Sequence, residues 1–264
     1  MAVTKKADPA IPNVFVRSGM FSVKSFRNID RPMVNLDIFT NDKARYVIKF
    51  DGYELNQADY QIFASLLRQQ RLSGLSYGSQ ISIPVLNICN DLAWMKSGQN
   101  YEIIWETMSR LRRANVVIKS GKNFYDGSLI LELDRDANKH VNYKLSSRIS
   151  ELFDDDCTYV NLSVIVGLKS MMSKWLYSYY QSHSMHIPMQ LEKIRQMMRV
   201  PERMATKEFN RNFRDALREV SELKTGPFVG WKIEQDILTV YKTNEKKEVS
   251  HMNFTEFPDP FETQ

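Results

Sequence analysis

The clearest amphipathic pattern in the chain runs from Thr206 to Lys224. At 3.6 residues per turn, its aromatic and aliphatic residues fall on one side, where they can pack against a core. The other side carries a row of cations at intervals of four, three and four residues, namely Lys207, Arg211, Arg214 and Arg218. Acidic residues such as Asp215 and Glu219 lie on a flank, where they can pair with arginines one turn away. With Thr206 as N-cap and Gly226-Pro227 as a stop signal, the pattern predicts a helix with one packed face and one arginine-lined face.

The segments on either side complete a recognisable order. A short helix is predicted over Ile187–Met198, with Pro188 in its first turn. Two strands, Phe228–Ile233 and Ile237–Tyr241, follow the basic helix and are separated by a turn. An isolated helix with a charged face is more often simply solvated. However, helix, turn, basic helix and hairpin is the order of a winged helix-turn-helix, in which the basic helix enters the major groove of DNA.

The first half of the chain repeats this order. Its predicted elements are a helix over Gln57–Arg71, an Ile-Pro pair at Ile83-Pro84, a helix over Asn100–Ala114, strands over Val116–Lys119 and Ser128–Leu133, and a third strand over Tyr143–Leu145. The second half has its own first helix over Val164–Ser182 and its own Ile-Pro pair at Ile187-Pro188. We therefore expect an α+β, mainly helical chain with two tandem winged-helix domains. The predicted boundaries are a flexible N-terminal arm over 1–30, domains over 31–158 and 159–243, and a C-terminal tail over 244–264.

Composition places few limits on function. Hydrophobic residues make up 43% of the chain, which is enough for a core, and the net charge of +5 only mildly favours a polyanionic partner. The two cysteines, Cys89 and Cys157, have no metal-site spacing and suggest a reducing compartment. No apolar run approaches the ~18 residues of a membrane span, and the N-terminus does not resemble a signal peptide. These features predict a soluble intracellular protein with no membrane partner.

Catalytic motifs are weak. The chain has no G-x-x-x-x-G-K-[ST] phosphate-binding loop. The only hint of a DNA-nicking enzyme is a pair of histidines, His183 and His186, close to Tyr177, Tyr179 and Tyr180. The spacing of the histidines does not suit a metal-binding pair, and the tyrosines lie on a predicted core helix. The acidic run over residues 154–156 is more often a solvated turn than a cation site. We expect no catalytic activity, no bound metal and no cofactor.

Several dispersed motifs resemble the TrfA-type plasmid replication initiators. They are Asp51–Asp59 (DGYELNQAD), Tyr101–Leu111 (YEIIWETMSRL), Tyr125–Ile130 (YDGSLI), Lys174–His183 (KWLYSYYQSH), and Lys207–Phe209 with Phe213–Leu217. Their order and spread cover about residues 31 to 243. The resemblance implies a bacterial protein, cytoplasmic and associated with plasmid or nucleoid DNA. Such a protein recognises direct repeats (iterons) in double-stranded origin DNA and helps to open an adjacent AT-rich segment.

The resemblance also implies partners. Members of this family work with the host initiator, the replicative helicase and the sliding clamp, and they exchange between homodimers and monomers. A clamp-binding segment is not apparent, because Ser150–Phe153 lacks a leading Gln and reads as core.

The predicted DNA contacts fall into three groups. By resemblance, the recognition helix contributes Lys207, Asn210, Arg211, Arg214 and Arg218, and the matching helix of the first unit contributes Arg110, Arg112 and Arg113. The three cations of the first unit can equally well complement the helix dipole. Lys119, Lys122 and Lys232, which we place on or beside the hairpins, are predicted to neutralise phosphates. Arginine can bond bidentately to guanine and asparagine to adenine. Two such modules should read half-sites ~10 bp apart.

A transcriptional repressor built from two winged-helix domains is the main alternative. It would use the same groove-reading residues, so these cannot separate the two functions. The family resemblance alone favours an initiator.

Overall fold

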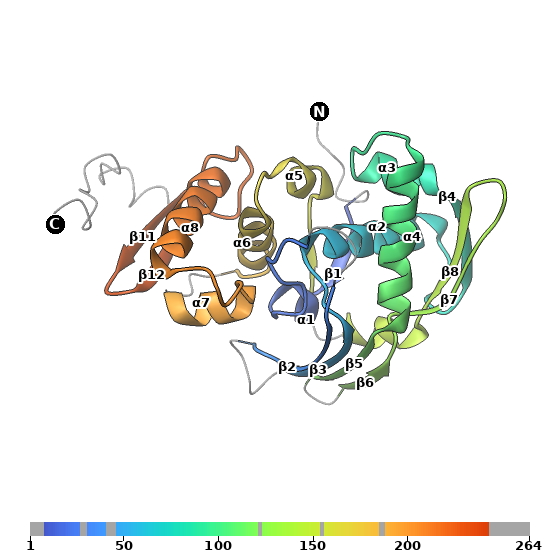
Figure 1. The fold of residues 1–264 in the computed structure, drawn as a ribbon, viewed down its shortest axis with the longest axis horizontal. Coiled ribbons are helices and arrows are strands. Elements are labelled where there is room, and N and C mark those ends of the chain that lie inside the picture. The colour runs from blue at the N-terminus through green and yellow to red at the C-terminus, as the bar shows by residue number, and fades with distance from the viewer. Residues whose placement is uncertain are drawn as a thin grey trace.

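The computed structural model describes residues 8–26, 31–40, 46–120, 123–153, 156–184 and 188–242. In the first half of the chain the elements are β1 (Ala10–Pro12), α1 (Asn13–Val16), β2 (Met33–Ile38), β3 (Tyr46–Tyr53), α2 (Gln57–Ser73), β4 (Gln80–Pro84), α3 (Val85–Asp91), α4 (Gly98–Arg113), β5 (Asn115–Ser120), β6 (Asn123–Gly127), β7 (Ile130–Arg135), β8 (His140–Leu145) and η1 (Ser147–Leu152). In the second half they are β9 (Cys157–Tyr159), α5 (Leu162–Gly167), α6 (Met171–Gln181), β10 (Met189–Gln190), α7 (Leu191–Met198), α8 (Thr206–Ser221), β11 (Gly230–Glu234) and β12 (Ile237–Tyr241) (Figure 1). The predicted mixture of helices and strands is confirmed.

The second half ends in a helical pair beside a small sheet. α7 and α8 follow one another, and β10, β12 and β11 form an antiparallel sheet in that order. Gln235 (φ 48°) and Asp236 (φ 59°) form the two-residue turn between β11 and β12. Left-handed backbone at both central positions gives a hairpin the twist that its strands require.

The helix predicted over Val164–Ser182 is interrupted. α5 ends at Gly167 and α6 begins at Met171. Ser170 separates them by accepting a hydrogen bond from the Ser173 amide (2.9 Å), which makes it the N-cap of α6. Both helices bury apolar residues, so the periodicity of the sequence continues across the break.

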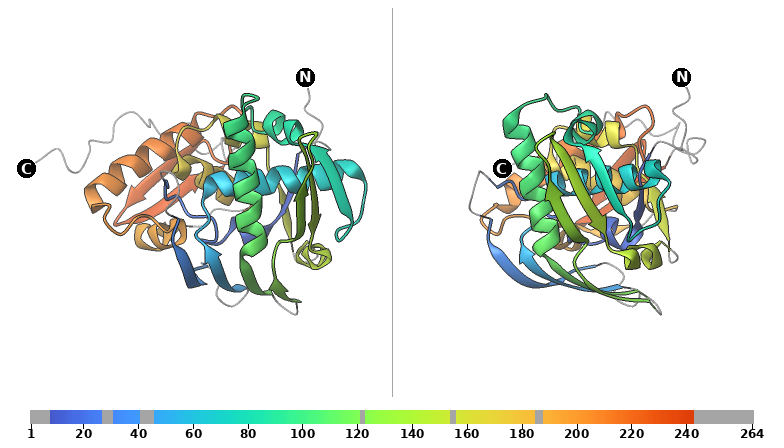
Figure 2. Two further views of the ribbon diagram at one scale, coloured as in Figure 1. Left: turned by 45° about the vertical axis from the view of Figure 1, so that its right-hand side comes forward. Right: turned by 90° about the vertical axis from the view of Figure 1, so that its right-hand side faces the viewer.

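The first half has the same order of helix, strand, helix, helix and hairpin in α2, β4, α3, α4 and β7–β8, and β4, β8 and β7 form one antiparallel sheet. An extra pair, β5–β6, is inserted between α4 and β7 and joins β2 and β3 in a separate sheet of order β2-β3-β5-β6. This four-stranded sheet lies below α4 in Figure 1 and is seen from two further directions in Figure 2.

The predicted pairing of Val116–Lys119 with Ser128–Leu133 is therefore wrong. β5 pairs with β3 and β6, whereas β7 pairs with β8. The alternation of β5 is satisfied by β3, where buried Ile118 lies opposite Ile48 and buried Val116 opposite Phe50. A period of two shows which face of a strand is buried, but it does not identify the neighbouring strand.

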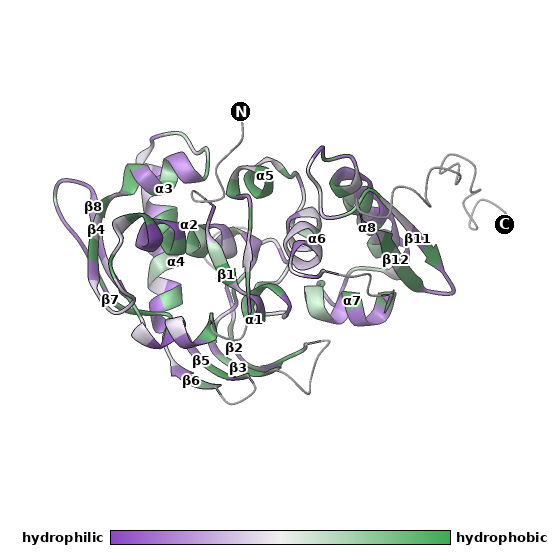
Figure 3. Cartoon of the chain, turned by 180° about the vertical axis from the view of Figure 1, so that it is seen from behind, coloured by the Kyte–Doolittle hydropathy of each residue, from purple (hydrophilic) through white to green (hydrophobic). Residues whose placement is uncertain are grey.

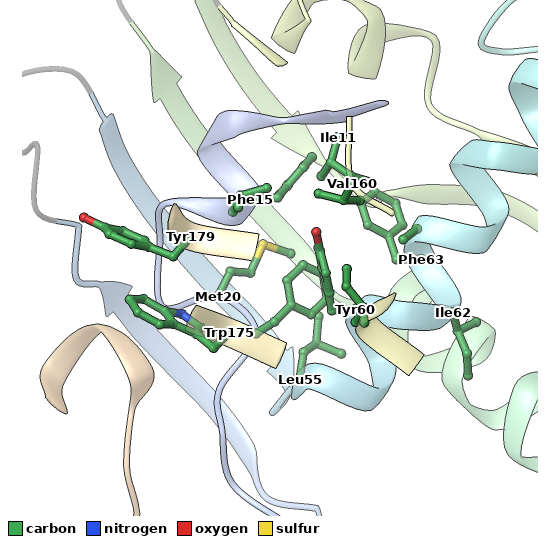
Figure 4. Packing of buried hydrophobic residues seen from close by; sticks show 14 of the residues in the cluster. Ile11, Phe15, Met20, Leu55, Tyr60, Ile62, Phe63, Val160, Trp175 and Tyr179 are labelled. Atoms are coloured by element: carbon green, nitrogen blue, oxygen red, sulfur yellow. The ribbon is translucent and has the colours of Figure 1, made fainter. Parts of the chain in front are cut away.

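The N-terminal segment from Pro9 to Lys24, called here the N-terminal strap, crosses both halves. Its apolar residues are buried, and Figure 4 shows Ile11, Phe15 and Met20 among side chains such as Phe63 and Trp175. The predicted flexible arm over residues 1–30 is wrong for this part of the chain. Residues 1–7 and 27–30, and the whole predicted tail over 244–264, lie outside the described residues.

The strap is fixed by backbone hydrogen bonds to distant elements. β1 pairs with β9, the Ser22 amide donates to the Leu55 carbonyl (2.9 Å), and the Val23 amide donates to the Met198 carbonyl (2.9 Å). The strap thus joins the beginning of α2 to the end of α7. Searched over the described residues, the helices include none that is long and apolar enough to cross a membrane.

Candidate nucleic-acid interface

The predicted amphipathic helix is confirmed as α8. Phe209, Phe213, Leu217 and Val220 are buried on its inner side, where it packs against α6 and β11. Lys207, Arg211 and Arg218 are exposed, and Arg214 is half-buried. Both hydrophilic and hydrophobic colours appear along α8 in Figure 3, in keeping with this two-sided pattern. The helix therefore presents a row of cations over three turns.

Two acidic residues on the flank of α8, Asp215 and Glu219, have different partners. Asp215 forms an ion pair with Arg218 (3.0 Å). Both side chains are 62% exposed, so water screens this pair strongly. Glu219, which the sequence placed within reach of the arginines, instead points to the beginning of α6. There it accepts hydrogen bonds from the Lys169 amide (2.8 Å) and the Ser173 hydroxyl (2.5 Å).

The beginning of α8 differs from the prediction. Thr206 is the first residue of the helix, and the N-cap is Ala205, which offers no side-chain hydrogen bond. Arg195 of α7 occupies this region instead. It donates hydrogen bonds to the Met204 carbonyl and to the Thr206 hydroxyl (3.3 Å).

A small depression lies between α8 and the β11–β12 turn. Its lining residues are Leu191, Asn210, Phe213, Arg214, Ile233, Gln235 and Asp236, and its volume is about 220 Å³. That is less than the ~300 Å³ at which small-molecule sites usually begin. Asn210 and Arg214, two of the predicted base-contacting residues, share this edge of α8 with the hairpin turn.

Lys232, predicted to contact phosphate, lies on β11 in the same hairpin. It forms an ion pair with Glu234, and this hydrogen bond raises the pKa of the Lys232 ammonium. Its charge is therefore retained at neutral pH but is partly offset by its neighbour.

The first unit presents a different helix face. Arg110 donates a 2.8 Å hydrogen bond to Asp59, whose side chain is fully buried, and a second of 2.6 Å to Thr107. Arg112 and Arg113 are exposed at the end of α4. The other exposed residues of α4 include Glu102 and Glu106, so its surface carries charges of both signs.

Lys119, predicted for the first hairpin, is not on the β7–β8 hairpin. Lys119 is exposed on β5 in the four-stranded sheet, with its ammonium 5.8 Å from the centroid of the Phe124 ring. Lys122 lies outside the described residues. The hairpin of the three-stranded sheet is β7–β8, and the cations at its turn, Arg135 and Lys139, were not among the predicted residues.

Those two cations pack on aromatic residues of α4. The Arg135 guanidinium lies 4.8 Å from the Trp105 ring centroid and pairs with Glu102 (2.8 Å), and the Lys139 ammonium lies 5.7 Å from the Tyr101 ring centroid. The turn residues Asp136, Ala137 and Asn138 between two alternating segments were the available sequence signal for this hairpin.

The three tyrosines that hinted at nicking chemistry are buried. Tyr177, Tyr179 and Tyr180 are all buried on α6, and burial raises the pKa of Tyr177 to about 12. Burial also lowers the pKa of His183 to about 4, and its Nδ1–H donates a hydrogen bond to the Tyr179 carbonyl (2.8 Å). The three tyrosines are part of the packed core. His186 lies outside the described residues, and the residues that are described include no cluster of three potential metal ligands.

Comparison with known proteins decides the family. The model of the TrfA protein family matches residues 1–230. The chain belongs to the TrfA protein family. This membership agrees with the dispersed motifs that run from Asp51 to Leu217. A search of curated proteins gave no match.

Two solved structures share the fold of this TrfA family member. A crystal structure of selenomethionine derivatives of domains 2 and 3 of RctB has a TM-score of 0.57 and 13% sequence identity, covering 88% of this chain and 98% of that chain. A second crystal structure of RctB domains 2-3 has a TM-score of 0.52 and 12% identity, covering 89% and 99%. At this identity the likeness extends to the fold alone.

Proposed function

We propose that this TrfA family member is a plasmid replication initiator that binds iterons in duplex origin DNA. The observation that carries the proposal is α8, whose apolar face is buried while Lys207, Arg211, Arg214 and Arg218 lie in one row beside a β-hairpin. A rod of this diameter fits a major groove, and a guanidinium can both neutralise phosphate and read guanine.

Two winged-helix domains are part of the proposal. The order of helix, strand, helix, helix and hairpin occurs in both halves, each time with a three-stranded antiparallel sheet. We assign these domains to residues 31–158 and 159–243. The likeness to RctB domains 2 and 3, which covers nearly all of that two-domain structure, supports the assignment.

The two domains have different tasks in this proposal. α8 reads bases through Asn210, Arg211 and Arg214, and Lys207, Arg218 and Lys232 add phosphate contacts. In the first domain Arg112, Arg113 and Lys119 are exposed and offer phosphate contacts. Arg110 is left out of the proposed interface, because it neutralises buried Asp59.

Family membership supports the remaining parts of the proposal. The bound protein assists opening of an adjacent AT-rich segment and recruits the host initiator, helicase and sliding clamp, in the bacterial cytoplasm. It has no catalytic activity of its own and exchanges between homodimer and monomer.

The test is a protection map of the plasmid's own origin at two salt concentrations, with reactivity of unpaired bases recorded in the AT-rich flank. We expect protected direct repeats, a steep loss of affinity with salt, and protein-dependent unpairing. Exchange of Lys207, Arg211 and Arg218 for alanine should abolish protection, whereas Lys193→Ala on α7 should not. No protection at low salt would overturn the proposal, and protection without unpairing would favour a repressor.

A further inference from the structure

α8 is held at both of its ends by side chains that lie off its cationic row. This matters because base recognition by a helix requires its side chains to stay within about 0.5 Å and 10–20° of their productive geometry. The inference below rests on the proposed DNA-binding function of α8.

At the N-terminal end, Arg195 of α7 donates hydrogen bonds to the residues around the start of α8. Its guanidinium bonds to the Met204 carbonyl just before the helix and to the Thr206 hydroxyl at its first residue. The same group lies 5.5 Å from the ring centroid of Phe209. Phe209 is buried and stacks on Phe213 at 5.3 Å, so Arg195 joins the first turn of α8 to the core beneath it.

At the other end, Glu219 joins α8 to α6. One carboxylate oxygen accepts from the Lys169 amide and the other accepts from the Ser173 hydroxyl. Ser173 is itself fully buried and is fixed by Ser170, the N-cap of α6. A carboxylate beside the N-terminus of a helix is also favoured by the helix dipole.

Glu219 lies thirteen positions after Thr206, which at 1.5 Å per residue places the two attachments about 20 Å apart. With one attachment, the tilt and roll of α8 would be limited only by the packing of its apolar face. Two attachments to different helices, α7 and α6, restrict both the tilt of α8 and its rotation about its own axis.

We propose that Arg195 and Glu219 are positioning residues that set sequence discrimination by fixing the tilt and roll of α8 in the groove. Neither belongs to the row of DNA-contacting cations. Their loss therefore reduces discrimination between sequences more than it reduces affinity for DNA in general.

The experiment is selection and sequencing from a duplex library with a randomised 20-bp core, using full-length protein. It compares wild type with Arg195→Lys, Arg195→Ala, Glu219→Gln and the control Lys193→Ala. Lys193 is an exposed cation on α7, two residues from Arg195, and controls for lost charge. Dissociation constants are then measured for the selected duplex and a scrambled one at the same salt concentration.

We expect the ratio of scrambled to selected dissociation constants to fall about tenfold for Arg195→Ala and Glu219→Gln. For Arg195→Ala, affinity for the scrambled duplex should match that of Lys193→Ala to within a factor of two to three. Arg195→Lys keeps the charge but loses the planar fork, so it should lose discrimination as well. It also keeps the test decisive if Arg195→Ala does not fold.

The coupling between Glu219 and Ser173 provides a second measurement. In a Ser173→Ala background, Glu219→Gln should have a smaller effect on the ratio than in the wild-type background. An unchanged ratio in Arg195→Lys and Glu219→Gln would overturn the inference and leave the proposed function intact. If wild type itself selects no motif, both fail together.

Discussion

Arg199, the residue that follows α7, pairs with Glu54, the carboxylate three residues before α2. The Glu54 side chain is 2% exposed and Arg199 is 12% exposed. Lys24 of the strap reaches the same carboxylate at 3.0 Å. One buried acid therefore neutralises cations from the strap and from the second half of the chain.

The first prediction concerns this acid. Glu54→Gln should lower the free energy of unfolding by about 3–5 kcal/mol, because it leaves Arg199 buried without its counter-charge. Glu102→Gln is a matched control, since Glu102 belongs to an ion pair whose side chains are more than half exposed. The control should change stability by less than ~1 kcal/mol. Urea denaturation measures both, and a loss below ~1 kcal/mol for Glu54→Gln would contradict a central role for this acid.

Gly19 supports the same contact from the strap. A Cβ atom at Gly19 would lie 2.7 Å from the Met197 carbonyl oxygen, and that backbone has no flexible end to move aside. We predict that Gly19→Ala destabilises the protein by about 1–3 kcal/mol. Gly98→Ala is the matched control, because nothing lies within 4 Å of its added Cβ at the start of α4. The control should be neutral or stabilising by ~0.5 kcal/mol, and equal thermal shifts for both variants would refute the prediction.

The sequence predicted elements that are fixed by contacts between nearby residues, and it missed contacts between residues far apart in the chain. The strong periodicity from Phe209 to Val220 identified α8, because a helix is specified by residues three and four apart. The strap was missed because its partners are remote, as in the hydrogen bond from Thr158 to Asn13, 145 positions away. Arg110 was assigned to DNA for the same reason, because its partner Asp59 lies 51 positions earlier.

The sequence also did not predict which strands pair with each other. Residues 116–119 alternate as a strand should, but nothing in that alternation distinguishes β3 from β7 as the neighbour. The positioning side chains Arg195 and Glu219 were also outside the predicted site. The sequence predicted that Glu219 pairs with arginines of its own helix, whereas it contacts α6. Arg195, for which the sequence predicted no role, contacts the residues around the start of α8.

His183 gives a pH dependence to stability. Burial is the main cause that lowers the His183 pKa to about 4, and the charges of Arg17 and Lys242 act in the same direction. The hydrogen bond to the Tyr179 carbonyl and the charge of Asp156 oppose this shift. The unfolded chain, with an ordinary pKa near 6.5, therefore binds this proton more readily than the folded protein. The stabilisation is present above pH ~6.5 and is lost as the pH falls towards 4, on the order of 3 kcal/mol at most.

We predict that His183→Gln flattens the fall in unfolding free energy between pH 6.5 and 4.5 relative to wild type. NMR titration of the His183 ring protons provides the direct check. An apparent pKa above 6 in the folded protein would contradict the burial argument.

Base reading by α8 leads to a separate prediction. Arg214 lies beside Asn210 at the depression that faces the hairpin turn. Arg214→Ala should cost about 1–3 kcal/mol at one base position of the selected motif and leave the others unchanged. Binding-site selection measures this, with Lys193→Ala as control. A uniform loss across all positions would instead assign Arg214 to phosphate.

The exposed Asp215–Arg218 pair leads to the last prediction. Asp215 places a negative charge beside the cationic row and holds Arg218 at 3.0 Å. Asp215→Asn should therefore raise affinity for any duplex a few-fold and steepen its salt dependence, because one more cation becomes available to phosphate. Stability should change by less than ~1 kcal/mol, since both side chains are well exposed.

Asp37→Asn on the four-stranded sheet removes the same charge from an exposed pair elsewhere. Equal gains in the two variants would attribute the effect to net charge alone, and a gain confined to Asp215→Asn would assign it to the row on α8.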